Sequence, residues 1–337
     1  MFDILILGGD LIDGSGAARR PSDIGICGDK IAAIGDLRQS ESGRILKADG
    51  LTITPGFIDT HAHSDGALLV DPQHSNSIRQ GITTELIGQD GLSYAPMSPE
   101  NYLMTRHYLS GLYGFPPENI DTSSVRAFLN NFDRKTAVNV AYPVPHNAIL
   151  METTGFHDLP LEGIAMEKAK DIVRDAMEQG SVGLSTGLSF FPNSWSRTSE
   201  IIELCKIVAE YGGVYITHLR YILPDRGIHL DESEDPEKVH EALEIGRRSG
   251  VKIHFSHFRT DAQNAGQIDL LMANVDKGKS EGIDCTLELY PYPAGSGAPF
   301  VFLPDWASEG GPDSVISFLH SPQARSRIIS FLNDTAE

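Results

Sequence analysis

Hydrophobic positions at the start of the chain come in short runs that are separated by glycine-containing turns. The runs are Ile4–Leu7, Leu11-Ile12, Asp23–Ile26, Lys30–Ile34 and Ile45–Ala48. Short apolar runs bounded in this way are typical of strands joined by tight turns, and they leave no room for a helix of useful length. Residues 1–54 are therefore predicted to form the N-terminal portion of a small β-sandwich.

From Pro55 the pattern changes, and short apolar runs alternate with segments of helical periodicity. The predicted strands are Phe57–Thr60, Thr83–Ile87, Ala137–Tyr142, Val182–Ser185, Val214–Thr217, Lys252–Ser256 and Ile283–Leu289. The predicted helices are Ser124–Asn131, Ala165–Gln179, Ser199–Tyr211, Pro236–Ser249, Ile268–Glu281 and Gln323–Leu332. This alternation predicts an α/β fold with a parallel sheet, and residues 55–337 are predicted to form a (β/α)8 barrel because no dinucleotide-binding fingerprint is present. We count seven strands, so we expect the barrel to be truncated before its eighth strand.

Composition and charge narrow the class of protein. The 337 residues are 40% hydrophobic and 22% charged, as in globular proteins with a full core. The net charge of −19 argues against a nucleic-acid partner, because phosphate backbones need clustered Lys and Arg. Three widely spaced cysteines form neither a disulfide framework nor a CxxC motif, and no segment is long enough to span a membrane. We therefore expect a cytoplasmic protein, of unknown oligomeric state, that acts on a small molecule.

Histidines lie at the end of the first predicted barrel strand, where barrel enzymes carry their chemistry. His61 and His63 are two residues apart, so in an extended segment their side chains point to the same side. Imidazole nitrogen is a preferred zinc ligand. Two ordinary histidines at a strand end are the alternative, but their place after Pro55-Gly-Phe-Ile-Asp favours metal binding.

Further candidate ligands follow three other strands. Asp90 comes after the second strand between glycines, which fits either a carboxylate ligand or a simple Asp-Gly turn. His218 and His257 end the fifth and sixth strands at equivalent positions. Together with the first pair they make a four-histidine constellation that fits a two-metal site. We expect His254 to face outward from this site.

Other polar residues near the predicted barrel mouth suit substrate binding. Arg259 offers a guanidinium fork for a carboxylate, and Tyr290 and Ser296 offer hydroxyl groups. His146 follows the third strand and is a further histidine with a possible functional role. Each of these signals is weak by itself, because every barrel has polar residues in its loops.

The motifs together resemble the D-aminoacylase (N-acyl-D-amino-acid deacylase) branch of the amidohydrolase superfamily. The resemblance extends over essentially the whole chain. It is carried by Asp3–Gly16, Pro55–Asp65, Gly81–Thr84, Gly91–Pro96, Gly183–Leu188, Gly212–Arg220, Ser256–Arg259 and Tyr290–Ser296.

This resemblance implies a zinc-dependent barrel enzyme with a β-sandwich built from both chain ends. It implies hydrolysis of the amide bond of N-acyl-D-amino acids by a water whose pKa is lowered by zinc. His218, His257 and Asp90 would hold a tightly bound zinc, and His61 and His63 a second, weaker one. Arg259, Tyr290 and Ser296 would hold the substrate carboxylate.

Three departures from the family's pattern affect these expectations. Asp90 stands where the best-known members have cysteine, which changes the hardness of the ligand. Phe190 stands where the family has a tyrosine that helps to hold the substrate carboxylate, so Phe190 and Phe191 suggest a more apolar pocket, while Arg220 and Arg226 suit acidic substrate side chains. The aspartate that acts as proton shuttle at the end of the eighth strand is expected beyond residue 337.

Two alternatives remain open from the sequence. A dihydroorotase- or hydantoinase-like enzyme would need a bridging lysine after the fourth strand, where this chain has Gly183-Leu-Ser-Thr-Gly-Leu. From a different class, the chain would be a truncated, inactive metal-binding fragment of a deacylase, with poor solubility because a missing strand leaves two unpaired sheet edges. The preferred acyl group and side chain are not indicated.

Overall fold

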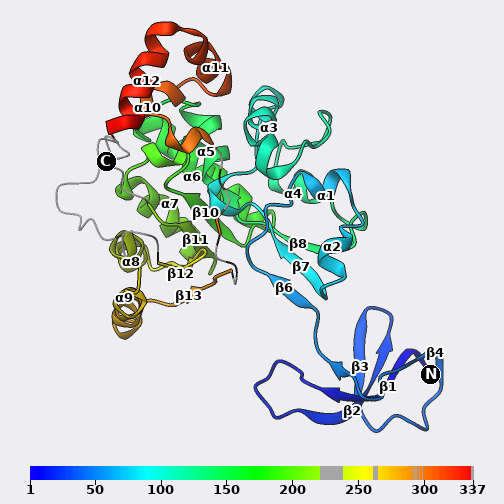
Figure 1. The fold of residues 1–337 in the computed structure, drawn as a ribbon. Helices are drawn as coiled ribbons and strands as arrows, with labels where there is room; N and C mark the ends of the chain where they lie inside the picture. Colours follow the sequence, from blue (N-terminus) through cyan, green and yellow to red (C-terminus); the bar gives the residue numbers. More distant parts are fainter. Residues whose placement is uncertain are drawn as a thin grey trace. The chain divides into compact units, whose positions relative to one another are not determined.

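The chain divides into two compact units, Met1–Phe57 and Ile58–Glu337. The computed structural model describes residues 1–220, 238–260, 265–290, 292, 294–295, 297 and 299–334 (Figure 1). Ser296 and Arg226, both considered above for substrate binding, lie outside the described residues. No helix within the described ranges combines the length and the apolar character that crossing a membrane requires.

The N-terminal unit is a five-stranded sheet. Its strands are β1 (Phe2–Leu11), β2 (Arg20–Cys27), β3 (Lys30–Gly35), β4 (Ser42–Lys47) and β5 (Thr52–Ile53). They run in the order β3-β2-β1-β4, with β5 also pairing with β1. The buried carboxylate of Asp23 accepts hydrogen bonds from the backbone N–H groups of Gly8 and Leu37, at 2.8 and 3.0 Å, and so joins the irregular part of β1 to the segment after β3. That the sheet is part of a composite sandwich stays a prediction.

Two sheets form the centre of the second unit. One contains β6 (Phe57–Asp59), β7 (Ile82–Leu86) and β8 (Asn139–Ala141) in that order. The other contains β9 (Val144–Pro145), β10 (Gly183–Gly187), β11 (Val214–His218), β12 (Lys252–Phe255) and β13 (Cys285–Leu287), all parallel and in chain order. The predicted α/β class is confirmed. The third predicted strand, Ala137–Tyr142, contains β8, and the short β9 follows it as a separate strand after Pro143, which has no N–H to continue the ladder.

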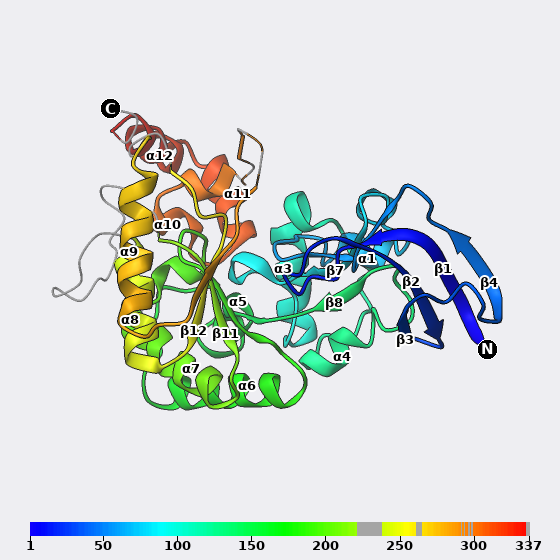
Figure 2. The same ribbon diagram turned by 90° about the horizontal axis from the view of Figure 1, so that it is seen from below.

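Helices cover the outer face of the five-stranded sheet. α6 (Gly163–Glu178), α7 (Thr198–Glu210), α8 (Lys238–Ser249) and α9 (Ile268–Ser280) each alternate with a strand and lie along the outer side of β11 and β12 in Figure 2. The remaining helices are α1 (Ala67–Val70), α2 (Ser75–Ile78), α3 (Pro99–Tyr113), α4 (Val125–Leu129), α5 (His146–Thr153), α10 (Asp305–Ser308), α11 (Pro312–His320) and α12 (Pro322–Asp334). Three 3₁₀ turns are described, η1 (Gln89–Gly91), η2 (Asn193–Trp195) and η3 (Pro299–Phe302).

The sequence reading missed α3, the helix that borders the site described below. Its start signal was present, since Ser98 accepts a hydrogen bond from the N–H of Asn101 and Pro99 occupies the first turn. Gly114 follows its last residue with a φ of 82°, as helix-ending glycines commonly do. The helix was overlooked because its apolar residues are interrupted by polar ones and do not form a clear stripe.

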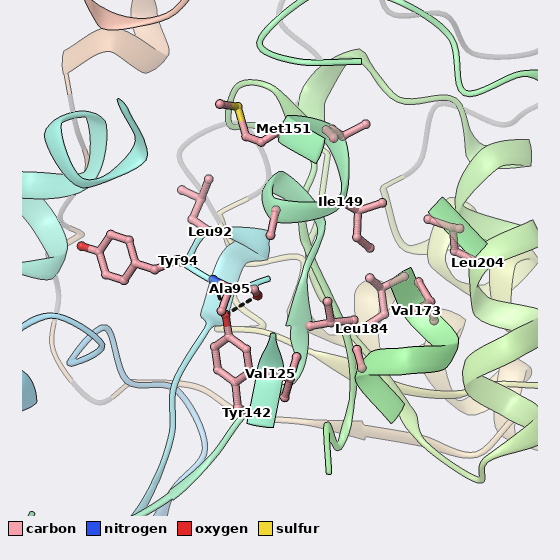
Figure 3. Packing of buried hydrophobic residues seen from close by; sticks show 14 of the residues in the cluster. Leu92, Tyr94, Ala95, Val125, Tyr142, Ile149, Met151, Val173, Leu184 and Leu204 are labelled. Atoms are coloured by element: carbon pink, nitrogen blue, oxygen red, sulfur yellow. Dashed lines mark hydrogen bonds between the residues drawn. The ribbon is translucent and has the colours of Figure 1, made fainter. Parts of the chain in front are cut away.

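A continuous apolar core joins the loop after β7 to the strands and helices around β10. Figure 3 shows Ala95 of this loop at the Tyr142 ring, and Leu92, Tyr94 and Leu184 belong to the same apolar cluster. The Tyr142 hydroxyl donates to the Ala95 carbonyl at 2.8 Å and accepts from the Ala95 N–H at 3.2 Å. The hydroxyl of Tyr142 and the backbone of Ala95 thus satisfy each other's hydrogen bonds inside the core. These two bonds fix the loop that begins with the candidate ligand Asp90.

Candidate metal centre

His61 and His63 lie directly after β6, as the sequence predicts. Their Nε2 atoms are 3.3 Å apart, and their rings meet edge to face at a centroid distance of 5.0 Å. His63 Nδ1 contacts the hydroxyl of Tyr113 at 2.9 Å, and that hydroxyl donates to the Gln89 carbonyl at 2.9 Å. The phenol oxygen therefore accepts a hydrogen from Nδ1, which leaves His63 Nε2 with a free lone pair.

Asp90 lies between these histidines and the next two strands. It belongs to η1, and its side chain is buried, with 7% of its surface exposed. One oxygen, Oδ1, is 3.7 Å from His61 Nε2, 3.6 Å from His218 Nδ1 and 3.6 Å from His257 Nε2. The other, Oδ2, is 3.6 Å from His63 Nε2. The carboxylate thus faces all four histidines, with one oxygen toward three of them and the other toward the fourth.

His218 is the last residue of β11, and His257 follows β12 in a turn. Their atoms Nδ1 and Nε2 are 2.8 Å apart. His257 has a φ of 34° and Asp90 a φ of 56°, both in the left-handed region that residues other than glycine rarely adopt. Two of the ligand candidates therefore sit in costly backbone conformations, which is common at functional sites.

The donor set fits a metal cation. Two ligand atoms at about 2.0–2.1 Å from a tetrahedral zinc lie about 3.3 Å apart, close to the separations found here. Asp90 Oδ1 is buried and has no hydrogen-bond partner among the residues that the structure describes. One compact set of ligand atoms, from His61, Asp90 and His257, lies within 4.8 Å of one another. An orphaned carboxylate oxygen facing imidazole nitrogens is what a cation would satisfy.

The electrostatics agree with this fit. Burial alone raises the pKa of Asp90, but the charges of His61 and His218 outweigh it and hold the pKa well below its ordinary value. Burial lowers the pKa of His63 to about 4. Burial also lowers the pKa of His61, but the carboxylates of Asp90 and Glu288 outweigh it and leave that pKa raised. Asp90 is thus anionic and His63 neutral at pH 7, the states in which both bind metals.

The cluster opens into a cavity of about 350 Å³. Arg259 and Tyr290 lie on its wall, where the Arg259 guanidinium carbon is 5.4 Å from the centre of the Tyr290 ring. Tyr290 stacks on Tyr292 at a centroid distance of 4.4 Å. Phe190 also lines the cavity, with its ring 4.7 Å from that of His218. The structure therefore brings Arg259, Tyr290 and Phe190 to the candidate ligands.

Several expectations need correction. His254 does not face outward: Ile253 and Phe255 pack in the apolar cluster under α8 and α9, so His254 lies on the opposite face, bonded to Thr286 at 2.8 Å. The strand alternation used in that prediction ends at Phe255, since a turn follows. Phe191 is fully buried against Trp195 and does not line the cavity.

Two other predicted residues lie inside the protein rather than on the cavity wall. His146 is fully buried at the start of α5, and burial, with a smaller effect of Arg220, lowers its pKa to about 3. Arg220 is buried in an ion pair with Glu241, with 3.0 Å between Nη2 and Oε1. It is therefore occupied within the protein and does not offer its charge to an acidic substrate.

The sequence reading missed Glu288 and Tyr113, which hold the first two histidines. Glu288 follows β13 at the same strand-end position as the ligand candidates, and that position was the available signal. Tyr113 ends α3, so it could not be found while that helix was missed.

Replacing Gly91 by alanine is expected to destabilise the Asp90 loop. Gly91 has a φ of 62°, and an added Cβ would lie 2.7 Å from the backbone of Thr186 and of Gly187. The left-handed conformation and the overlap together cost about 2–4 kcal/mol. Urea unfolding measures this loss. Gly111→Ala is the control, because Gly111 lies in α3 with open space at its Cβ position, and alanine should stabilise the helix by about 0.5–1 kcal/mol. Equal effects of both substitutions would contradict the prediction.

The chain is similar to known proteins in both sequence and structure. The model of the amidohydrolase family matches residues 44–276. D-aminoacylase of Alcaligenes xylosoxydans xylosoxydans is 34% identical over 300 residues, which cover 88% of this chain and 58% of that protein. The chain thus spans less than two thirds of the length of this relative.

Solved structures of similar proteins contain metals. N-acyl-D-glutamate deacylase from Bordetella bronchiseptica, complexed with zinc and a phosphonate inhibitor that mimics the tetrahedral intermediate, superimposes with a TM-score of 0.75 at 30% identity, over 87% of this chain and 59% of that one. A D-aminoacylase described as having a binuclear metal centre, with one-metal activation and second-metal attenuation, gives 0.74 at 31% identity, over 88% and 60%.

Proposed function

The chain belongs to the amidohydrolase family, and from this membership we propose that it acts in the zinc-dependent hydrolysis of N-acyl-D-amino acids to a carboxylate and a free D-amino acid. The observation that carries the proposal is the buried Asp90 carboxylate facing four histidines at the base of a cavity. Relatives that cleave such substrates support the substrate class. A bridging lysine of the hydantoinase type finds no support in β10, whose residues Gly183–Gly187 include none.

His218, His257 and Asp90 would hold the tighter zinc, and His61 and His63 the weaker one, with Asp90 between the two positions. When bound, zinc supplies Lewis-acid chemistry that polarises an amide carbonyl and makes a water acidic enough to attack at neutral pH. The carboxylate is suited to bridge, since its two oxygens face different histidines.

The cavity wall would bind and orient the substrate. Arg259 presents a guanidinium fork, which binds a carboxylate through two parallel hydrogen bonds, and Tyr290 lies beside it. Ser296, the third residue proposed for this role, would add a hydroxyl group. Holding the free carboxylate fixes the amide relative to the ligand cluster, which converts binding energy into correct geometry.

Aromatic side chains form another part of the cavity wall. Tyr108 and Phe300 lie against each other at a ring-centroid distance of 4.5 Å and line the same cavity. They would exclude water from the acyl side of the substrate, which strengthens the polar interactions within the site.

An assay of amine release from N-acetyl-D- and N-acetyl-L-amino acids tests the proposal. We expect turnover of the D substrates only, lost when zinc is removed by a chelator and regained when zinc is added back. Equal rates on the D and L substrates, or rates that do not change when zinc is chelated, would refute the deacylase proposal. Zinc binding without turnover of either the D or the L substrate would favour the alternative that the chain is an inactive, metal-binding fragment.

A further inference from the structure

Glu288 is a carboxylate that is not itself among the candidate ligands but contacts two of them, His61 and His257. Its Oε1 atom lies 2.8 Å from His61 Nδ1 and accepts the backbone N–H of His257 at 2.6 Å. The side chain is 14% exposed. A single oxygen atom therefore connects the residue after β6 to the residue after β12.

The backbone of Glu288 is fixed as firmly as its side chain. Its N–H donates to the Phe255 carbonyl at 3.1 Å, and its carbonyl accepts from the Phe258 N–H at 2.7 Å. These two bonds bracket the turn that contains His257, so Glu288 contacts that turn at three points. The position of the carboxylate therefore follows from the pairing of β12 and β13 and does not depend on a flexible side chain alone.

The contact with His61 determines which ring nitrogen faces the cluster. An ionised carboxylate only accepts hydrogen bonds, so the hydrogen of the neutral ring lies on Nδ1 and the lone pair on Nε2. His61 Nε2 points toward Asp90 Oδ1, at 3.7 Å. Such a carboxylate–histidine pair orients the ring and makes it a stronger ligand.

The hydrogen bond from the His257 N–H to Glu288 stabilises an unfavourable backbone conformation of His257. The φ of 34° turns the His257 ring so that Nε2 lies 3.6 Å from Asp90 Oδ1. A charged acceptor for its N–H offsets part of the cost of that conformation. By comparison, His63 Nδ1 meets the neutral hydroxyl of Tyr113.

We propose that Glu288 is a positioning residue that holds His61 and His257, candidate ligands of two neighbouring metal positions, in place around Asp90. The inference rests on the proposed zinc-dependent function and adds to it that the two zinc positions are linked through Glu288. It predicts that affinity for the metal, and not only activity, depends on this carboxylate.

The test is the zinc affinity of the full chain carrying Glu288→Gln, measured against a competing chromophoric chelator. The amide keeps the size of the side chain and removes its charge. We expect the affinity to fall about 10–100-fold, the usual range for partners of metal ligands. We also expect the visible absorption of the cobalt-substituted protein to change, which a general loss of stability would not produce in a folded variant.

Glu200→Gln is the matched control. Glu200 is also a buried carboxylate that accepts two backbone N–H bonds, from Leu161 at 2.9 Å and Arg197 at 3.1 Å, but it does not line the cavity. We expect its zinc affinity to stay within about twofold of the unchanged protein, because it lacks a ligand contact.

The outcomes separate this inference from the function on which it rests. If folded Glu288→Gln binds zinc as the control does, the role of Glu288 is refuted while the metal site stands. If the unchanged chain binds no zinc, the proposed function fails first. Should Glu288→Gln not fold, Glu288→Asp keeps the charge but is one methylene shorter, and unchanged zinc affinity in that variant would refute the inference equally.

Discussion

Replacing Asp90 by asparagine is expected to lower zinc affinity by more than about 100-fold and hydrolysis by about 10³-fold, while the fold is kept. Asparagine has the same size and tolerates the left-handed conformation that Asp90 adopts at a φ of 56°. It removes the negative charge that faces four histidines at 3.6–3.7 Å. Loss of several kcal/mol of Lewis-acid stabilisation corresponds to a rate decrease of about this size. Metal analysis and the deacylation assay measure the two effects.

Asp90→Cys is the informative companion to this variant. A thiolate is a strong zinc ligand, so we expect zinc to be retained in the tight position. A single sulfur replaces two oxygens that lie toward different histidines, so we expect the second zinc to be held more weakly. If Asp90→Asn kept both zinc content and activity, Asp90 would be a turn residue, the alternative that the Asp-Gly sequence allows.

Replacing Arg220 by methionine is expected to reduce the free energy of unfolding by about 3–5 kcal/mol, because it leaves the partner charge buried and unpaired. Arg220 and Glu241 are 3% and 6% exposed. The guanidinium also donates to the carbonyls of Ser194 and Ser196, both at 2.9 Å. Arg220 thereby joins the end of β11 to α8 and to the segment containing η2. Urea unfolding measures the loss.

Two control variants test whether the loss of unfolding free energy comes from breaking the buried ion pair. Arg174→Met removes an exposed pair with Asp171, 2.8 Å long on the surface of α6, and should cost no more than about 1 kcal/mol. Adding Glu241→Leu to Arg220→Met removes the stranded charge and should recover part of the stability. A loss no larger for Arg220→Met than for Arg174→Met would show that the buried pair contributes little.

Strand-end positions made most of the candidate ligands predictable. His61, Asp90, His218 and His257 lie at or just after the ends of β6, β7, β11 and β12, the end of barrel strands where barrel enzymes carry their chemistry. Predictions that depended on side-chain direction beyond a strand were less secure. His254 was assigned to the wrong face because the turn at His257, with its positive φ, breaks the alternation on which the assignment relied.

Charge alone did not reveal what a charged residue contacts. Arg220, two residues after His218, had the position of a substrate-binding residue, yet its partner Glu241 lies in α8, far away in sequence. Arg259, also two residues after a histidine, does line the cavity. The two arginines have the same local context, so only their long-range neighbours distinguish them.

The sequence by itself determined the α/β class, most of the strands and the candidate ligand residues, because hydrophobic periodicity and strand-end histidines are local properties of the chain. The tertiary structure decided which atoms meet: Asp90 Oδ1 with three histidines, Tyr113 with His63, and Glu288 with both His61 and His257. Glu288 and His61 are 227 positions apart. No local pattern encodes a contact of that kind, since it arises only when packing brings separate strand ends together.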